Sequence, residues 1–330
     1  MINQDELKNW VLKIQNADRI ALSKAITLIE SQKPEDRPIA NSLLKALSLD
    51  QSNTLRIGIT GPPGVGKSTL IEALGLHIIS QGYSVAVLSI DPSSAITKGS
   101  ILGDKTRMNK LAVETKAYIR PSPTGEHLGG VAQRTRESIW LCEAADFDFI
   151  LVETAGIGQS EYQVSTMTDL TVLMCLTGAG DDLQGIKKGI MEWADIIVLN
   201  KVDDEKDAKA LVSYKDLIVA SHFSESRIAA WDRKILKISS LYNKGIDALF
   251  KEIQSFKSLV YENHFIKKNR TQQLTSYYHD LLRIKLLDEV LRNPDVLRYI
   301  DETEINLIRL EISPEEAADV SIKFIFALFK

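Results

Sequence analysis

The stretch "LRIGITGPPGVGKST", Leu55–Thr69, decides the fold, because an apolar run is followed directly by a glycine-rich loop. Its residues Gly61–Ser68 match the pattern GxxxxGK followed by Ser or Thr, between a predicted strand and a predicted helix. The glycines let backbone N–H groups surround phosphates, Lys67 reaches the β and γ oxygens, and Ser68 offers a hydroxyl to magnesium. We predict a nucleoside triphosphate site whose phosphate-binding residues are Gly61, Pro62, Pro63, Gly64, Val65, Gly66, Lys67, Ser68 and Thr69.

Seven short apolar runs, separated by longer segments with helical spacing, predict the rest of the nucleotide-binding domain. Continuous apolar runs of this kind are typical of a mostly parallel sheet that helices cover on both faces. The fold class is therefore α/β, of the P-loop NTPase type. The runs are residues 54–60, 83–90, 116–120, 146–153, 169–177, 194–200 and 235–239.

Both ends of the chain have a helical pattern without strand signals. We predict a helical N-terminal extension over residues 1–50, with "KPEDRP" (33–38) between two helical pieces, and a GTPase domain over 51–258. Residues 259–330 form a helical arm, whose last helix starts at "SPEE" with Ser313 as the cap and Pro314 in the first position. The apolar continuation of this arm packs either on the main domain or against a second copy of the chain.

The base is predicted from "LNKVD", Leu199–Asp203, at the end of another apolar run. Asn200 can hold the loop, the Lys201 stem can cover the base, and Asp203 can accept hydrogen bonds from the ring N–H and the amine of guanine. Adenine has no such pair of donors. An isolated NKxD is often only a turn, but here "KISS" (237–240) follows as a clasp for the guanine oxygen. The base-binding prediction comprises Asn200, Lys201, Asp203, Ser239, Ser240 and Leu241.

Three acidic residues are candidates for the metal and the chemistry. Asp91 and Glu153 follow strand-forming runs, at the sheet edge where ligands bind, and Asp104 lies in "GDKTRM". The alternative for each is an exposed carboxylate at a strand end. Lys67, Glu153 and Asp104 are the predicted catalytic residues. The predicted magnesium site comprises Ser68, Asp91, Asp104 and Glu153.

Two loops have the composition of nucleotide switches. "TAGIGQSE" (154–161) follows Glu153, and "TGAGDDLQGIKKG" (177–189) follows another strand. Gln159 is not adjacent to Gly156, where a Ras-like enzyme would have its water-positioning glutamine, so slow hydrolysis completed by a partner is expected. Arg107, Lys187 and Lys188 are either phosphate-charge stabilisers or simply solvated basic residues.

The bulk composition excludes several other classes of protein. The 330 residues are 44% apolar and 25% charged with a formal net charge of −4, which does not indicate a nucleic-acid partner. Cys142 and Cys175 form no CxxC pair, and the five histidines form no HxH or HxxxH pair, so no metal-carrying segment is predicted. The polar N-terminus and the lack of an apolar run of ~20 residues predict a cytoplasmic protein without a membrane span.

With these motifs in place, the chain resembles the MeaB/ArgK/MMAA family, in the SIMIBI class of P-loop GTPases. The resemblance covers nearly the whole chain and includes "DPSSAITKGSILGDKTRM", "RPSPTGEHLGGVA", "ILVETAGIGQSE" and "GAGDDLQGIKKGIMEWAD". It implies GTP/GDP and Mg²⁺ as ligands and residues 178–188 as a third switch. It also implies a homodimer, and adenosylcobalamin delivery to a cobalamin-dependent acyl-CoA mutase, such as methylmalonyl-CoA mutase, which the protein also protects. The cofactor is then contacted only through the partner.

Two other functions belong to related proteins. A metallochaperone GTPase for nickel or zinc enzymes would need a Cys- or His-rich ligand segment, which the sequence lacks. A nucleotide-hydrolysing accessory protein of basic amino-acid (LAO/AO) transport would need adenine selectivity or membrane contacts, and "NKVD" argues against adenine.

Overall fold

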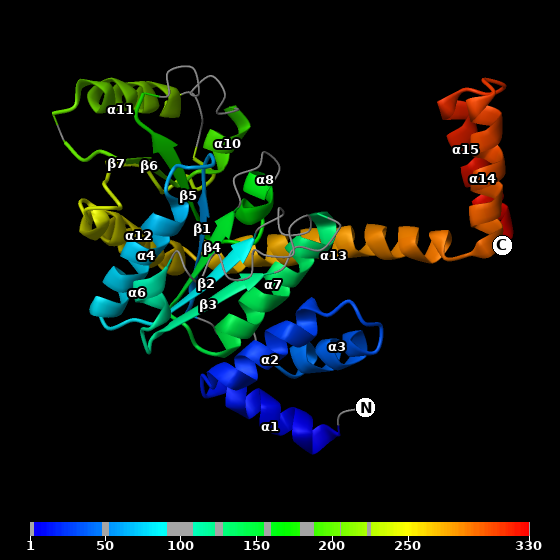
Figure 1. Cartoon of the computed structure of the whole chain (residues 1–330), viewed down its shortest axis with the longest axis horizontal. Coiled ribbons are helices and arrows are strands. Elements are labelled where there is room, and N and C mark those ends of the chain that lie inside the picture. The colour runs from blue at the N-terminus through cyan, green and yellow to red at the C-terminus, as the bar shows by residue number, and fades with distance from the viewer. Residues whose placement is uncertain are drawn as a thin grey trace. The chain divides into compact units, whose positions relative to one another are not determined.

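A computed structural model describes residues 3–47, 53–90, 108–122, 128–154, 160–178, 188–204, 206–222 and 226–329. The chain divides into two compact units, Met1–Arg270 and Thr271–Lys330 (Figure 1). The first unit contains the residues predicted as the N-terminal extension together with the nucleotide-binding domain. The domain limits at residues 50 and 258 stay predictions.

A seven-stranded sheet forms the centre of the first unit, in the order β3-β2-β4-β1-β5-β6-β7. All six neighbouring pairs are parallel, so the predicted fold class is confirmed. Because β1 lies between β4 and β5, strand order reverses beside it, and the loop after β1 lies where ligands bind in such sheets. The strands are β1 Leu55–Thr60, β2 Val85–Ile90, β3 Ala117–Ser122, β4 Phe149–Thr154, β5 Leu170–Leu176, β6 Ile196–Asn200 and β7 Lys234–Lys237.

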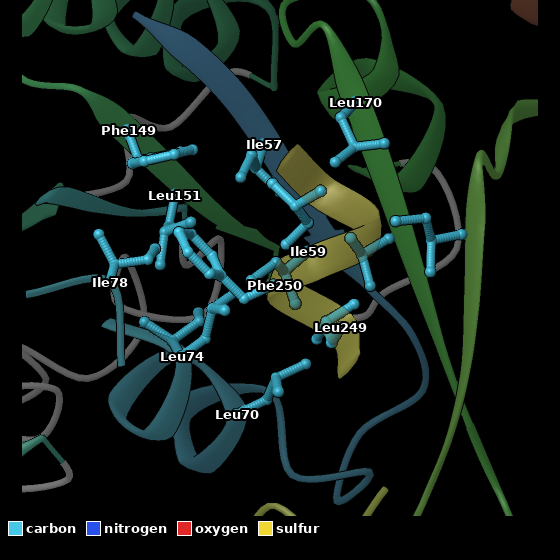
Figure 2. Packing of buried hydrophobic residues seen from close by; sticks show 14 of the residues in the cluster. Ile57, Ile59, Leu70, Leu74, Ile78, Phe149, Leu151, Leu170, Leu249 and Phe250 are labelled. Atoms are coloured by element: carbon cyan, nitrogen blue, oxygen red, sulfur yellow. The ribbon is translucent and has the colours of Figure 1, made fainter. Parts of the chain in front are cut away.

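Alternate strand residues face opposite layers of helices, because side chains alternate along a strand. On one face, β1, β2, β4, β5 and β6 pack against α4 (Lys67–Ser80), α6 (Asn109–Ala112) and α12 (Ile246–Glu262). Figure 2 shows Leu74 of α4 and Phe250 of α12 meeting Ile57 and Phe149 of the sheet. The other face is covered by α7 (Leu128–Ala144), α8 (Ser160–Ser165), α10 (Lys188–Trp193) and α11 (Ala208–Ser221).

The N-terminal extension consists of three helices that share a core with the sheet. They are α1 (Gln4–Gln15), α2 (Arg19–Glu30) and α3 (Asp36–Ala46). Their apolar faces join the cluster formed by β2, β4 and α7. Arg37 Nη1 donates to Glu137 Oε2 of α7 at 2.9 Å, and Arg120 of β3 pairs with Glu30 of α2. The predicted helical extension is therefore confirmed, but it has an additional break at residues 16–18 and belongs to the same core as the sheet.

The second unit contains the later part of α13 (Phe265–Leu291), with α14 (Pro294–Ile308) and α15 (Pro314–Leu328). The Ser313 side chain caps α15 by accepting from Glu316 N at 3.1 Å, and Pro314 occupies its first turn, as predicted. Tyr299 and Phe324 stack with ring centroids 4.0 Å apart, which joins α14 to α15. This unit exposes many large apolar side chains: Leu274, Tyr278, Leu282, Leu286, Leu287, Leu297, Ile305, Ile308, Leu310, Ile322 and Phe326.

A buried ionic network lies at the amino end of the sheet, opposite the loops predicted to bind nucleotide. Asp169 accepts from Arg56 N at 3.0 Å and from two nitrogens of Arg270, at 3.0 and 2.6 Å. Glu143 pairs with both Arg56 (2.6 Å) and Arg270 (3.1 Å). The network joins β1, the start of β5, the end of α7 and the beginning of α13. Burial alone would raise the pKa of Asp169, but the charges and hydrogen bonds of Arg270 and Arg56 hold it below its usual value.

We expect Asp169→Ala to destabilise the folded chain by about 3–5 kcal/mol, because it leaves buried arginine charge uncompensated. Since the folded pKa of Asp169 lies below its unfolded value, the unfolded chain takes up the proton first. The stabilisation is then complete above about pH 5 and declines as the pH falls below about 4. Thermal unfolding midpoints of wild type and Asp169→Ala, measured between about pH 2 and 7, test this, because the difference between the two proteins should shrink below about pH 4. The matched control is Asp280→Ala, because Asp280 forms an exposed pair with Arg283 and its loss should be nearly neutral.

Candidate nucleotide-binding site

The phosphate-loop candidate connects the end of β1 to the start of α4. Gly61 has a φ of 149° and Gly66 a φ of 96°, backbone conformations that residues other than glycine rarely adopt. A Cβ added at Gly61 would lie 2.5 Å from the Met174 carbonyl oxygen, and one at Gly66 would lie 2.7 Å from Asn200 Nδ2. The neighbouring strands therefore require glycine at both positions.

Lys67, the first residue of α4, directs its side chain back along this loop. Its Nζ donates to the carbonyl oxygens of Gly61 at 2.8 Å and Pro62 at 3.1 Å, and the residue is buried. The backbone N–H groups of the first turn of α4 begin at the same place, and such a helix N-terminus attracts anions. The loop thus combines a fixed ammonium group with a helix N-terminus, which is an arrangement suited to phosphate.

Ser68 and Glu153 meet at the edge of the phosphate loop. Ser68 Oγ donates its proton to Glu153 Oε1 at 2.8 Å, and Glu153, at the end of β4, is buried. A hydroxyl has one proton and two lone pairs, so this donation leaves the Ser68 lone pairs available to a cation. Oxygen donors of this kind fit Mg²⁺, which takes oxygen ligands and keeps several waters.

The other predicted metal ligands, Asp91 and Asp104, lie outside the described residues, as do Arg107, Lys187, residues 155–159 and residues 179–187. For Lys188, only its place at the start of α10 is described. In the described part of the chain, no group of three or more His, Cys, Asp or Glu side chains could hold a metal ion. Of the four predicted metal ligands, the structure therefore brings Ser68 and Glu153 together.

Asn200, at the end of β6, connects the phosphate loop to the predicted base-binding loop. Its Nδ2 donates to Val65 O at 2.8 Å, and its Oδ1 accepts from Ser240 N at 3.1 Å and Ser240 Oγ at 2.9 Å. Both Asn200 and Ser240 are buried. A single side chain therefore holds in place loops that follow three different strands.

The Asp203 carboxylate is held by the loop after β7. Ser239 Oγ donates to Asp203 Oδ1 at 2.6 Å, and Lys244 Nζ donates to Asp203 O at 2.6 Å. Lys201 has φ 62° and is exposed, and Leu241 is 71% exposed. Of the predicted base-binding residues, Ser239 therefore contacts the carboxylate of the exposed Asp203, and Ser240 contacts Asn200. Sequence reasoning missed Lys244, whose only signal was the turn-forming "NKG" after "KISSLY".

Comparison with known protein families identifies the family of this chain. The family described as "Methylmalonyl Co-A mutase-associated GTPase MeaB" matches residues 22–295. The chain belongs to the MeaB family. The match includes the phosphate loop, the Asn200–Asp203 segment and the loop after β7.

Relatives of the MeaB-family chain match it over most of its length. A "Probable GTPase" of Mycobacterium tuberculosis is 45% identical over 96% of this chain and 94% of its own. GTPase ArgK of Escherichia coli is 40% identical, over 95% of both chains. "Methylmalonic aciduria type A homolog, mitochondrial" of Mus musculus is 37% identical over 97% of this chain and 79% of its own.

A solved structure titled "Crystal structure of LAO/AO transport system kinase" has a TM-score of 0.79 and 33% identity, over 98% of this chain and 99% of that chain. Together with the relatives, it identifies this MeaB-family chain as a P-loop GTPase that binds guanine nucleotide. The family is associated with methylmalonyl-CoA mutase.

Two further observations on this MeaB-family chain concern its cysteines and the length of its apolar helices. Burial raises the pKa of the Cys175 thiol to about 12 and also raises that of Cys142, so both remain protonated and poor metal ligands at neutral pH. None of the helices in the described ranges is long and apolar enough to cross a membrane.

Proposed function

We propose that this MeaB-family GTPase is a Mg²⁺-dependent switch that gates delivery of adenosylcobalamin to an acyl-CoA mutase, such as methylmalonyl-CoA mutase, and protects that enzyme. The observation that carries the proposal is the position of Asn200, which joins phosphate and base loops in a chain of a mutase-associated family. Nucleotide contacts made at one loop are therefore transmitted directly to another. In this proposal the cobalamin cofactor is contacted only through the partner.

The site residues take the following roles in this proposal. Lys67 and the backbone of Gly61–Thr69 bind the phosphates, while Asn200, Lys201, Asp203, Ser239, Ser240 and Leu241 bind guanine. Ser68, Asp91, Asp104 and Glu153 would hold magnesium, which supplies positive charge to the phosphate oxygens when it is bound. Ser68 donates its proton to Glu153, which leaves its lone pairs available to such an ion. Glu153 and Asp104 act with Lys67 in catalysis.

The switch itself uses residues 154–161 and 177–189. In this proposal the two glycine-rich segments make different contacts with and without a γ-phosphate, since only a difference in contacts between the two states transmits a signal. Since the chain has no glutamine next to Gly156, we propose that the mutase completes the hydrolytic site.

A homodimer formed through α13–α15 is the proposed assembly. Ile308, Leu310 and Phe326 are 80%, 90% and 68% exposed, and apolar surface on this scale is typical of an interaction site. The mass of the purified chain in solution distinguishes one copy from two. We also propose a cytoplasmic location, which the two free buried thiols support.

Steady-state GTP hydrolysis tests the proposed function, measured with and without a purified adenosylcobalamin-dependent mutase from the same organism. We expect the mutase to raise turnover by about 10-fold or more, since completing a phosphoryl-transfer site has a large effect. ATP is the control for base selectivity, because a solved relative is titled a transport system kinase. The Lys67→Ala variant with mutase measures any contaminating GTPase.

Stimulation by one mutase supports the switch and identifies its client. Unchanged GTP turnover with every candidate mutase would leave the GTPase intact and exclude the chaperone role. Faster hydrolysis of ATP than of GTP would instead favour the transport-associated alternative.

A further inference from the structure

Ser89 of β2 lies beside the Ser68–Glu153 pair. The Cα atoms of Ser89 and Glu153 are register partners on the adjacent parallel strands β2 and β4. On β2, Val85 and Val87 belong to the cluster under α4, and on β4, Phe149 and Leu151 do the same. Because side chains alternate along a strand, Ser89 and Glu153 both point to this face, on neighbouring strands about 4.8 Å apart.

The Ser89 hydroxyl is buried and has no hydrogen-bond partner in the described part of the chain. The residue is 3% exposed, and its Oγ makes no hydrogen bond with any residue that the structure describes. Most buried polar groups in proteins are hydrogen-bonded, so an exception calls for an explanation such as a water or an ion. A buried serine without a partner among the described residues, next to a carboxylate that already accepts from Ser68, points to a ligand that enters the same edge of the sheet.

We propose that Ser89 is a positioning residue for hydrated magnesium: its Oγ accepts a hydrogen bond from a metal-bound water beside Glu153. Mg²⁺ keeps several of its waters when proteins bind it, and each of these waters has protons to donate. The Oε1 atom of Glu153 already accepts a hydrogen bond from Ser68. Since the described residues include no cluster of three or more acidic, His or Cys side chains, the Ser89 hydroxyl supplies an additional acceptor for the waters of the ion. This inference rests on the proposed magnesium dependence.

The proposal predicts that removal of the Ser89 hydroxyl weakens Mg²⁺ binding without lowering the stability of the fold. Removing an unpartnered buried hydroxyl should leave the nucleotide-free protein as stable as before or slightly more stable, because no hydrogen bond is lost. In the magnesium complex the same change removes one hydrogen bond. We expect Ser89→Ala to need about 5-fold more Mg²⁺ to reach half of the Mg²⁺-dependent gain in nucleotide affinity. This factor corresponds to the loss of about 1 kcal/mol.

The experiment titrates Mg²⁺ against the affinity for a fluorescent GDP analogue, starting from excess chelator, in wild type, Ser89→Ala and Ser138→Ala. Ser138 is the matched control, because its Oγ is also buried and unpartnered among the described residues but lies on α7, over the opposite face of the sheet. Thermal midpoints without nucleotide are measured for all three proteins. We expect both variants to keep the midpoint and the chelator-limit affinity, and only Ser89→Ala to shift the Mg²⁺ curve.

Equal Mg²⁺ curves for Ser89→Ala and wild type would overturn the role of Ser89 while leaving the proposed metal in place. A loss of affinity of the same size in chelator would also overturn it, because the effect would then be on the loop and not on the ion. If the wild-type protein itself showed no Mg²⁺ dependence, the proposed metal and the role of Ser89 would both be wrong.

Discussion

Lys67→Ala is expected to reduce GTP hydrolysis by at least about 100-fold, the scale seen when one preorganised charge-stabilising donor is removed from an active site. The Lys67 ammonium lies over the phosphate loop, 2.8 Å from Gly61 O, so alanine removes the one side-chain cation that the described loop directs at the phosphates. The measurement is kcat/KM for GTP at saturating Mg²⁺, together with the dissociation constant for GDP.

The thermal midpoint distinguishes a loss of activity from a loss of fold. We expect it to change little, because the Lys67 ammonium donates to the loop carbonyls of Gly61 and Pro62 and does not belong to the hydrophobic core. Lys8→Ala is the matched control, since Lys8 is exposed on α1 and far along the chain from the loop. Wild-type GTP turnover in Lys67→Ala would show that the phosphate site lies elsewhere.

Asp203→Asn is expected to shift base selectivity from guanine to xanthine. Ser239 Oγ donates to Asp203 Oδ1, so in the variant the amide oxygen takes this place and the NH₂ group faces the base. The amide then donates to the xanthine oxygen, where the carboxylate accepted from the guanine amine. Two hydrogen bonds to a charged group contribute about 3–6 kcal/mol, so the ratio of GTP to XTP affinity should change by about 10²–10⁴-fold.

Competition of GTP and XTP against a fluorescent GDP analogue measures this ratio. Asp204→Asn is the control, because Asp204 is the adjacent exposed acid and its Oδ1 accepts from Lys206 N within its own loop. An unchanged ratio in Asp203→Asn would count against guanine recognition by Asp203 and would indicate that another loop binds the base.

Local patterns in the sequence were enough to predict the sheet and the site candidates. Each of the seven apolar runs overlaps one strand, although β3 and β4 end beyond their runs and β7 begins one residue before its run. The runs were predictable because a continuous apolar run with helical segments around it is a property of neighbouring residues. The phosphate loop was predictable for the same reason, since Gly61, Gly66 and Lys67 belong to one short motif, although the contacts with Met174 and Asn200 that require the two glycines come from distant strands. The Ser313 cap of α15 was read from four consecutive residues.

Contacts between distant segments were decided only by the tertiary structure. Asn200 reaches Val65 and Ser240 because β6, β1 and β7 end at one edge of the sheet, and Ser89 comes beside Glu153 because β2 pairs with β4. The packing of α1–α3 into the core and the Asp169–Arg270 pair likewise join segments far apart in the chain. The spacing of apolar residues and the residues that form turns act over a few positions, so they determined the helices and strands. The partners of each polar side chain depend instead on which strands pair and on which face of the sheet each helix packs.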